Sequence, residues 1–366
     1  MAKPTKLDLR SLVGQTLIVG FDGVMVSAKL RTMLQTLQPA GVILFARNIR
    51  EPRQTWELLR ECQKCVATPM FLCVDMEGGT VDRLRNVIAP APSVADIVAS
   101  RNRPLFRQHG RVIGQECAAM GFNVDFAPVL DLGFAASRSV LTTRTASADP
   151  KQTVIYAREF LRGLNDAHML GCGKHFPGLG EANLDTHHEL AAVDKPWKKL
   201  WEEDLFPYRT LHRQMPFIMV AHALYSAVTR DKTPASVARK WISDILRKKI
   251  GYRGLIVSDD LEMGGIQKVM PIGEAAIATL KAGSDLSLVC HKEQGIWEAY
   301  DAVLKAAERD RRFAARVAEA ANHVLAFKKR SPALKHRRPA PTQAAVDRLR
   351  RALWELSEEA RLAELV

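Results

Sequence analysis

Apolar residues along the chain fall in short runs, and longer segments with helical spacing of apolar positions separate these runs. The segments 52–66, 150–166 and 236–250 repeat apolar positions every three or four residues, which predicts surface helices. A short apolar run followed by such a helix is typical of a βα unit in a parallel sheet. Repetition of this unit predicts the α/β class and a single (β/α)8 barrel of the TIM type. The predicted strands are 16–21, 41–45, 70–75, 124–130, 171–175, 217–222, 254–259 and 285–290.

The C-terminal part of the chain departs from this repeat. A helical pattern over 292–329 would cover the last strand, and the proline-containing segment 331–341 interrupts it. Residues 342–366 then predict one further amphipathic helix. We therefore expect a catalytic barrel over 1–330, followed over 331–366 by a basic linker and a C-terminal helical extension. This extension could pack on the barrel or mediate self-association, so a monomer and a homodimer both stay open.

Targeting signals and cysteine usage limit the compartment. The first residues lack the basic, apolar and small-residue regions of a secretion signal, and no apolar run approaches the roughly 20 residues of a membrane span. Six cysteines are scattered over 366 residues, which favours reduced thiols, and only Cys62 and Cys65 form a CxxC pair. These observations predict a cytoplasmic protein without disulfides and without a membrane span.

A formal net charge of +13 raises the question of an anionic partner. Much of the excess lies in the patches 328–330, 335–338 and 348–351, and no nucleic-acid-binding motif accompanies them. We therefore interpret these patches as a solvated basic tail and predict no nucleic-acid partner. An anionic substrate or partner stays open.

Polar residues gather at the ends of the predicted strands, which is where a (β/α)8 barrel places its chemistry. The third strand ends in Asp75, the fifth in Lys174 and His175, the sixth in His222, and the seventh in Asp259. Charged groups at the end of an apolar strand are poor choices for packing. Their shared position predicts one functional site at the mouth of the barrel.

A segment rich in Gly, Pro and titratable residues, 173–188, follows the fifth strand and predicts a long loop. Asp185 and His187 are two residues apart, so the carboxylate could hold one ring nitrogen while the other nitrogen faces a substrate. Asp259, at the end of the seventh strand, could act as a fixed nucleophile. The three residues together predict a catalytic site with an acid/base and a nucleophile.

Six segments follow one another along the chain in the order of a known family. The most specific is KHFPGLGEANLDTHHEL, and the others are VDMEGGTVDRL, NVDFAPVLDL, RTASADP, MVAHALY and VSDDLEM. Together they resemble glycoside hydrolase family 3, and within it the single-domain bacterial β-N-acetylhexosaminidases of peptidoglycan recycling. The first segment is similar to the family's KHFPGHGxxxxDSH loop, and the resemblance covers about residues 41–290.

Carried over position by position, the resemblance implies that Asp259 forms a covalent glycosyl-enzyme and that His187 is the acid/base, oriented by Asp185. On the residues alone, Arg83 and Arg144 could instead pair with carboxylates at the barrel rim. The expected substrate-binding residues are Asp75, Arg83, Arg144, Lys174, His175, His222 and Met263.

The activity that the resemblance implies is retaining, exo-type removal of a terminal β-linked N-acetylglucosamine from muropeptides or related small glycans. No cofactor and no metal is implied, and the histidines lack the helical spacing of a zinc motif. Thr80, Leu179 and Glu181 depart from the family's usual residues, which bears on substrate preference. The alternatives are a family 3 β-glucosidase or β-xylosidase, a glycoside phosphorylase, and a non-catalytic glycan sensor.

Overall fold

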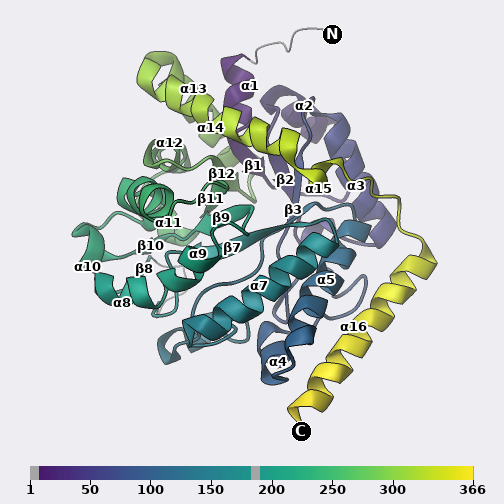
Figure 1. Ribbon diagram of the computed structural model, residues 1–366. Helices are drawn as coiled ribbons and strands as arrows, with labels where there is room; N and C mark the ends of the chain where they lie inside the picture. Colours follow the sequence, from purple (N-terminus) through teal and green to yellow (C-terminus); the bar gives the residue numbers. More distant parts are fainter. Residues whose placement is uncertain (1–7, 183–189, 366) are drawn as a thin grey trace.

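The computed structural model describes residues 8–182 and 190–365, which form a closed barrel of parallel strands surrounded by helices (Figure 1). The strands lie around the barrel in the order β1, β12, β11, β9, β7, β6, β3, β2, so strands that follow one another in the chain are neighbours. Each predicted strand overlaps one of these, which confirms the single (β/α)8 barrel. The barrel strands are β1 (Leu17–Val19), β2 (Gly41–Ile43), β3 (Phe71–Val74), β6 (Val124–Asp125), β7 (Leu170–Phe176), β9 (Phe217–Val220), β11 (Leu255–Asp260) and β12 (Leu286–Val289).

Two short sheets lie outside the barrel, and one of them follows β3 directly. This antiparallel hairpin turns at Gly78 and Gly79, whose φ angles of 83° and 60° fall in the left-handed region that favours glycine. A Cβ on Gly78 would lie 2.1 Å from the carbonyl oxygen of Pro92, so no larger residue fits there. The short strands are β4 (Met76–Gly78) paired with β5 (Val81–Asp82), and β8 (Ala191–Ala192) paired with β10 (Ala223–Leu224).

The helices follow the predicted pattern, with two differences. The segment predicted as one helix over 236–250 is a 3-10 turn followed by a π-helical stretch, and 292–329 forms two helices. The break comes at Asp310, whose carboxylate caps the second helix by accepting the N–H of Arg312 at 2.8 Å. The helices are α1 (Leu9–Gly14), α2 (Ala28–Leu37), η1 (Ala46–Asn48), α3 (Pro52–Lys64), α4 (Val94–Ala99), α5 (Arg103–Ala119), η2 (Ala135–Ser137), α6 (Arg138–Leu141), α7 (Pro150–Asp166), α8 (Trp197–Glu202), α9 (Leu205–Leu211), α10 (Ser226–Thr229), η3 (Ala235–Val237), η4 (Lys240–Lys249), α11 (Gly264–Gln267), α12 (Ile272–Ala282), α13 (Glu293–Arg309), α14 (Arg311–Arg330), α15 (Pro332–Lys335) and α16 (Gln343–Glu364).

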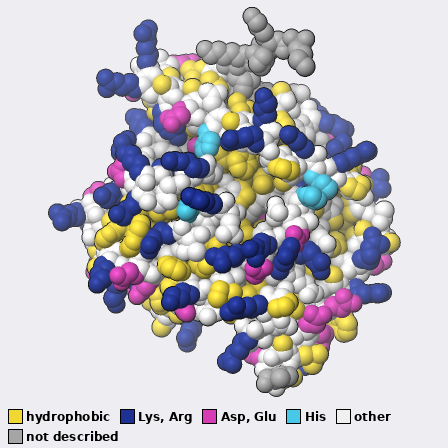
Figure 2. Space-filling view, viewed as in Figure 1, with side chains coloured by type: hydrophobic (Ala, Val, Ile, Leu, Met, Phe, Trp, Pro, Cys, Tyr) yellow, Lys and Arg dark blue, Asp and Glu magenta, His cyan; other side chains and the backbone are white. Residues whose placement is uncertain are grey.

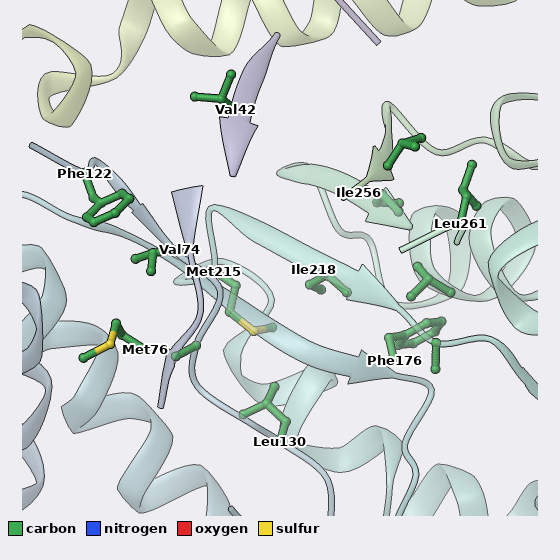
Figure 3. Packing of buried hydrophobic residues seen from close by; sticks show 14 of the residues in the cluster. Val42, Val74, Met76, Phe122, Leu130, Phe176, Met215, Ile218, Ile256 and Leu261 are labelled. Carbon is green, nitrogen blue, oxygen red and sulfur yellow. The ribbon is translucent and has the colours of Figure 1, made fainter. Parts of the chain in front are cut away.

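Two apolar layers hold the barrel together. Successive strand residues point to opposite faces, so Phe217 and Val257 fill the barrel interior. Their neighbours Ile218 and Ile256 pack between the strands and the outer helices (Figure 3). The alternation explains why the strand segments are apolar at nearly every position, since both faces are buried.

The C-terminal helix α16 packs against α4 and α5 at the side of the barrel (Figure 1). Leu349, Leu353 and Leu356 are buried in this contact, and the Arg350 guanidinium donates to the carbonyl oxygen of Ile88 at 3.0 Å. Within residues 8–182 and 190–365, no helix is long and apolar enough to cross a membrane.

A buried lysine lies where α14 and α15 close one end of the barrel interior. Val324 and Ala333 belong to the inner apolar cluster there, and Lys328 is 3% exposed beside them. Its Nζ donates to Gln15 Oε1 at 2.8 Å and lies 5.1 Å from the centre of the Phe71 ring. Burial lowers the pKa of Lys328 to about 7, because an ammonium is poorly solvated among apolar side chains.

This pKa predicts a pH-dependent stability. Between pH 7 and about 10 the unfolded chain binds the Lys328 proton and the folded chain does not, so the free energy of unfolding should rise with pH. Lys328→Met removes this contribution and should flatten the rise. Urea unfolding at several pH values measures it, with the exposed neighbour Lys329→Met as the control. An equal slope in wild type and Lys328→Met would contradict the assignment.

Candidate active site

A cavity of about 310 Å³ opens at the carboxyl ends of the barrel strands. It receives side chains that follow β2, β3, β7, β11 and β12, as the strand-end argument predicts. The predicted residues that line it are Asp75, Arg83, Arg144, Lys174, His175, Asp259 and Met263. Asp185 and His187 lie outside the described residues.

A buried network of charges forms one wall of this cavity. Lys174 Nζ lies 2.8 Å from Asp75 Oδ1 and 2.6 Å from Glu77 Oε1. Arg144 meets Glu77 with two parallel contacts, from Nε at 2.7 Å and from Nη2 at 2.9 Å. The Lys174 and Glu77 side chains are at most 3% exposed, so the charges compensate one another rather than being solvated.

The charges within the network shift one another's proton affinities. Burial alone would raise the pKa of Glu77, but the Arg144 and Lys174 cations hold it well below its usual range. Burial would lower the pKa of Lys174, and the Asp75 and Glu77 carboxylates raise it instead. Glu77 and Lys174 are therefore ionised at neutral pH and hold one another in place at the cavity wall.

His175 is oriented by a carboxylate that the sequence did not single out. Asp131 is fully buried, and its Oδ2 lies 2.6 Å from His175 Nδ1. Its Oδ1 accepts the backbone N–H of Leu179 at 2.7 Å. The contact with Asp131 fixes the orientation of the imidazole ring, which lines the cavity.

Asp131→Asn tests this orientation. The amide removes the anionic acceptor for the ring N–H, so we expect kcat/KM to fall by about 10²-fold with a smaller change in unfolding temperature. Steady-state kinetics and thermal unfolding on one preparation provide the measurements. Asp301→Asn on the exposed face of α13 is the control, and equal kinetics for wild type and Asp131→Asn would contradict the role.

The two carboxylates at the end of β11 have different partners. The pairing of β11 with β12 shifts register between Val257 and Asp260. Asp260 Oδ1 accepts backbone N–H groups of Glu262 and Cys290, each at 3.1 Å. Asp259 Oδ1 accepts the N–H of Asp260 at 2.9 Å, and both side chains line the cavity. Backbone donors from other segments hold Asp260, so Asp259 is the candidate nucleophile.

His291 and Phe45 form the opposite wall, and sequence reasoning missed both. Their rings stack with centres 5.3 Å apart, and His291 Nε2 lies 3.3 Å from Asp260 Oδ2. The hydrogen bond with Asp260 raises the pKa of His291. The guanidinium carbon of Arg83 lies 5.6 Å from the Phe45 ring centre, and its Nε has no hydrogen-bond partner among the described residues. Arg83 thus has a donor to offer a ligand.

The structure does not place His222 in the cavity. The ring is fully buried, with Nδ1 2.7 Å from Ser236 Oγ and Nε2 2.9 Å from the carbonyl oxygen of Asp260. Both nitrogens are therefore occupied beneath the cavity floor, which suits a residue that positions the end of β11. The rim pairing considered for Arg144 does occur, with Glu77, although Arg144 also lines the cavity.

The missed residues carried a usable signal. Phe45 and His291 each lie two residues after a barrel strand, close to the carboxyl end where the other site residues lie. The expectation that chemistry gathers at these strand ends therefore applies to them equally. Glu77 lies two residues after Asp75, on the hairpin that follows β3. Asp131 was harder to predict from the sequence. Its contact with His175 exists only because β7 pairs beside β6.

Metal ligands and reactive thiols do not gather in the described part of the chain. No group of three or more His, Cys, Asp or Glu residues among residues 8–182 and 190–365 is arranged to hold a metal ion. Cys62 and Cys65 are buried free thiols, and burial raises the pKa of both.

A (β/α)8 barrel whose mouth holds a strand-end carboxylate within a small polar cavity is typical of barrel glycoside hydrolases. Comparison with known proteins specifies the family. The glycosyl hydrolase family 3 N terminal domain matches residues 8–327. The chain therefore belongs to glycosyl hydrolase family 3 and is a glycoside hydrolase.

Individual relatives agree with this assignment. A beta-hexosaminidase of Alkalilimnicola ehrlichii is 37% identical over 76% of this chain and 82% of its own length. A beta-hexosaminidase of Pseudomonas aeruginosa is 35% identical over 75% of this chain and 82% of its own length. Among solved structures, a family 3 β-N-acetylglucosaminidase from a Paenibacillus species superposes with a TM-score of 0.90 and 31% identity, covering 97% of this chain and 69% of that one. A β-N-acetylhexosaminidase from Beutenbergia cavernae gives 0.80 at 26% identity, covering 89% of this chain and all of that one.

Proposed function

We propose that the protein is a retaining exo-β-N-acetylglucosaminidase that removes terminal β-linked N-acetylglucosamine from muropeptides or related small glycans. The observation that carries the proposal is Asp259, a strand-end carboxylate facing a cavity of about 310 Å³ whose other wall is an ionised polar network. The names of the most similar relatives, beta-hexosaminidase and β-N-acetylglucosaminidase, support the choice of sugar.

In the proposed reaction, the Asp259 carboxylate attacks the anomeric carbon while the bond to the leaving oxygen breaks. His187 gives its proton to that oxygen, so the glycan leaves as an alcohol and a covalent glycosyl-enzyme forms. A water molecule then attacks the same carbon and gives a proton to His187. Asp259 leaves as a carboxylate, so both residues return to their starting states. Asp185 would orient His187 in both steps. No cofactor or metal is required for these steps.

The cavity supplies the groups that would hold the sugar ring. Asp75 can accept hydrogen bonds from hydroxyl groups, whereas Lys174, Arg83 and Arg144 can donate them. Met263 offers an apolar surface beside Asp259. Asp75, Lys174 and Arg144 are held by their ion pairs, which limits the reorganisation needed when the substrate binds.

Release of 4-nitrophenol from the β-N-acetylglucosaminide and from the β-glucoside tests the activity, with His187→Ala as the variant of the acid/base. We expect preference for the acetamido sugar and a strong loss in His187→Ala. Preference for the glucoside would favour a β-glucosidase. A sugar phosphate that forms only in added phosphate would favour a phosphorylase, because a neutral histidine does not repel an incoming anion. No turnover of either substrate would favour a glycan sensor.

We place the protein in the cytoplasm, as a monomer or homodimer. The supporting observation is that all six cysteines are free and buried, which is typical of a reducing compartment. Fractionation of cells into cytoplasm and periplasm tests the compartment, and light scattering tests the assembly. Recovery in the periplasmic fraction would overturn the placement.

A further inference from the structure

A second cavity, of about 430 Å³, lies at the end of the barrel opposite the catalytic cavity. Its walls come from η4, the turn at 251–254, the end of α12, the residue before β12 and one face of α14. Figure 2 shows Lys and Arg side chains spread over the face in view, with Asp and Glu side chains among them. The basic residues that line this cavity are Arg239, Arg247, Lys248, Arg253, Lys281, Arg316 and His323.

The acidic residues of this basic cavity are already engaged. Asp285 and Glu319 are its two carboxylates, facing six Lys and Arg side chains. Burial would raise the pKa of Asp285, but the Arg247 charge and the hydrogen bond with His323 lower it. Glu319 Oε2 lies 2.8 Å from Arg316 Nη1. A clear excess of positive charge therefore remains within one concavity.

His323 is held at one wall of this cavity by two contacts. Its Nδ1 lies 2.9 Å from Asp285 Oδ1, and its Nε2 lies 3.2 Å from the carbonyl oxygen of Arg253. The ring therefore occupies Asp285 from the side opposite Arg247, which also contacts this carboxylate.

Backbone carbonyl groups hold two of the arginine side chains in place. Arg247 donates to the carbonyl oxygen of Gly254 at 2.6 Å, and Arg316 donates to those of Leu280 at 3.0 Å and Ser284 at 2.7 Å. Arginine side chains held by backbone carbonyls keep a constant position, so they hold a positive wall in place without a ligand.

Three further cations have no such engagement. Within residues 8–182 and 190–365, no carboxylate lies within ion-pair distance of Arg239, Arg253 or Lys281. Lys281 lies 5.4 Å from the centre of the Phe313 ring and is otherwise exposed. These side chains can turn toward a ligand, and an anion between them would relieve their mutual repulsion.

We propose that the basic cavity binds a phosphate-bearing anion, a function separate from the proposed glycosidase reaction. A single carboxylate would neutralise only part of the surplus charge, whereas a phosphate monoester carries about two negative charges and a pyrophosphate more. Arginine guanidinium groups match phosphate oxygens in pairs, which suits the mixture of fixed and free arginines. The phosphate could belong to a soluble metabolite or to the headgroup of an anionic lipid, and both sources share this chemistry.

Calorimetric titration of the full-length protein with inorganic pyrophosphate, at constant ionic strength, tests the site. We expect saturable binding that Arg253→Glu/Lys281→Glu weakens at least about tenfold. Arg348→Glu/Lys305→Glu makes the same change of net charge at exposed positions elsewhere and should leave the binding unchanged. Absence of saturation up to about 10 mM, or equal weakening in both double variants, would overturn the proposal.

Vesicles distinguish the two sources of phosphate. Binding to phosphatidylcholine vesicles that contain phosphatidylglycerol, with displacement by pyrophosphate, would assign the site to lipid headgroups. Binding of pyrophosphate alone would assign it to a soluble ligand. Vesicle binding that pyrophosphate does not displace would count against this cavity. Hydrolysis of the chromogenic β-N-acetylglucosaminide is expected to persist in Arg253→Glu/Lys281→Glu, so failure here is distinguishable from failure of the proposed activity.

Discussion

Asp259→Ala is expected to lower kcat/KM for the 4-nitrophenyl β-N-acetylglucosaminide by about 10⁴-fold or more. The loss follows because the other carboxylate at the end of β11, Asp260, also lines the cavity but is held by the backbone N–H groups of Glu262 and Cys290. Added azide should restore part of the rate, because the small anion can enter the space left by the carboxylate. The product should then be the α-glycosyl azide, formed by a single displacement.

The neighbouring carboxylate provides the matched control. Asp260→Asn keeps an oxygen that can accept the two backbone N–H groups, so we expect a loss of about tenfold or less and no rescue by azide. Proton nuclear magnetic resonance of the product identifies its anomeric configuration. A large loss in Asp260→Asn together with activity in Asp259→Ala would reverse the two assignments.

Glu77→Gln is expected to destabilise the fold by about 3–5 kcal/mol. The substitution leaves the Arg144 and Lys174 cations buried without their shared carboxylate. Because these two cations also line the cavity, the KM for the chromogenic substrate should rise in the same variant. Urea unfolding and steady-state kinetics on one preparation measure the two effects. Glu159→Gln breaks an exposed helical pair with Arg162 and should change stability by less than about 0.5 kcal/mol.

The same carboxylate predicts a loss of stability in acid. The pKa of Glu77 is held well below its usual range, so the unfolded chain binds this proton more readily than the folded chain. Its contribution is therefore present above the ordinary pKa of a glutamate and is lost as the pH falls toward the folded value. Wild type should lose stability on acidification more steeply than Glu77→Gln, and equal slopes would contradict the ion pairing.

Local patterns were sufficient to predict the architecture. Each barrel strand is a short apolar run because both of its faces are buried, as the alternation of Phe217 and Ile218 between the two clusters illustrates. Such a pattern depends on neighbouring residues alone. The exact extent of helices was less predictable, because the break at Asp310 depends on one capping side chain inside a continuous apolar periodicity.

Strand-end position was sufficient to gather most of the candidate site. Asp75, Lys174, His175 and Asp259 were singled out because a parallel barrel brings all carboxyl ends to one mouth, and the structure places them around one cavity. The same rule misplaced His222, which follows a strand yet points beneath the cavity floor. The position of a residue along its strand decides at which end of the barrel it lies. Whether its side chain then points into the cavity depends on the register of the strand with its neighbours.

By itself the sequence determined the barrel, the mouth at which its polar residues meet, and the family resemblance. Tertiary structure alone decided which charged residues of the site pair with one another. Arg144 lies 67 residues from its partner Glu77, and His175 lies 44 residues from its partner Asp131. Periodicity of apolar positions is a local property, readable over a dozen residues. Charge pairing across strands depends on barrel closure and register, and these arise from the packing of the whole chain.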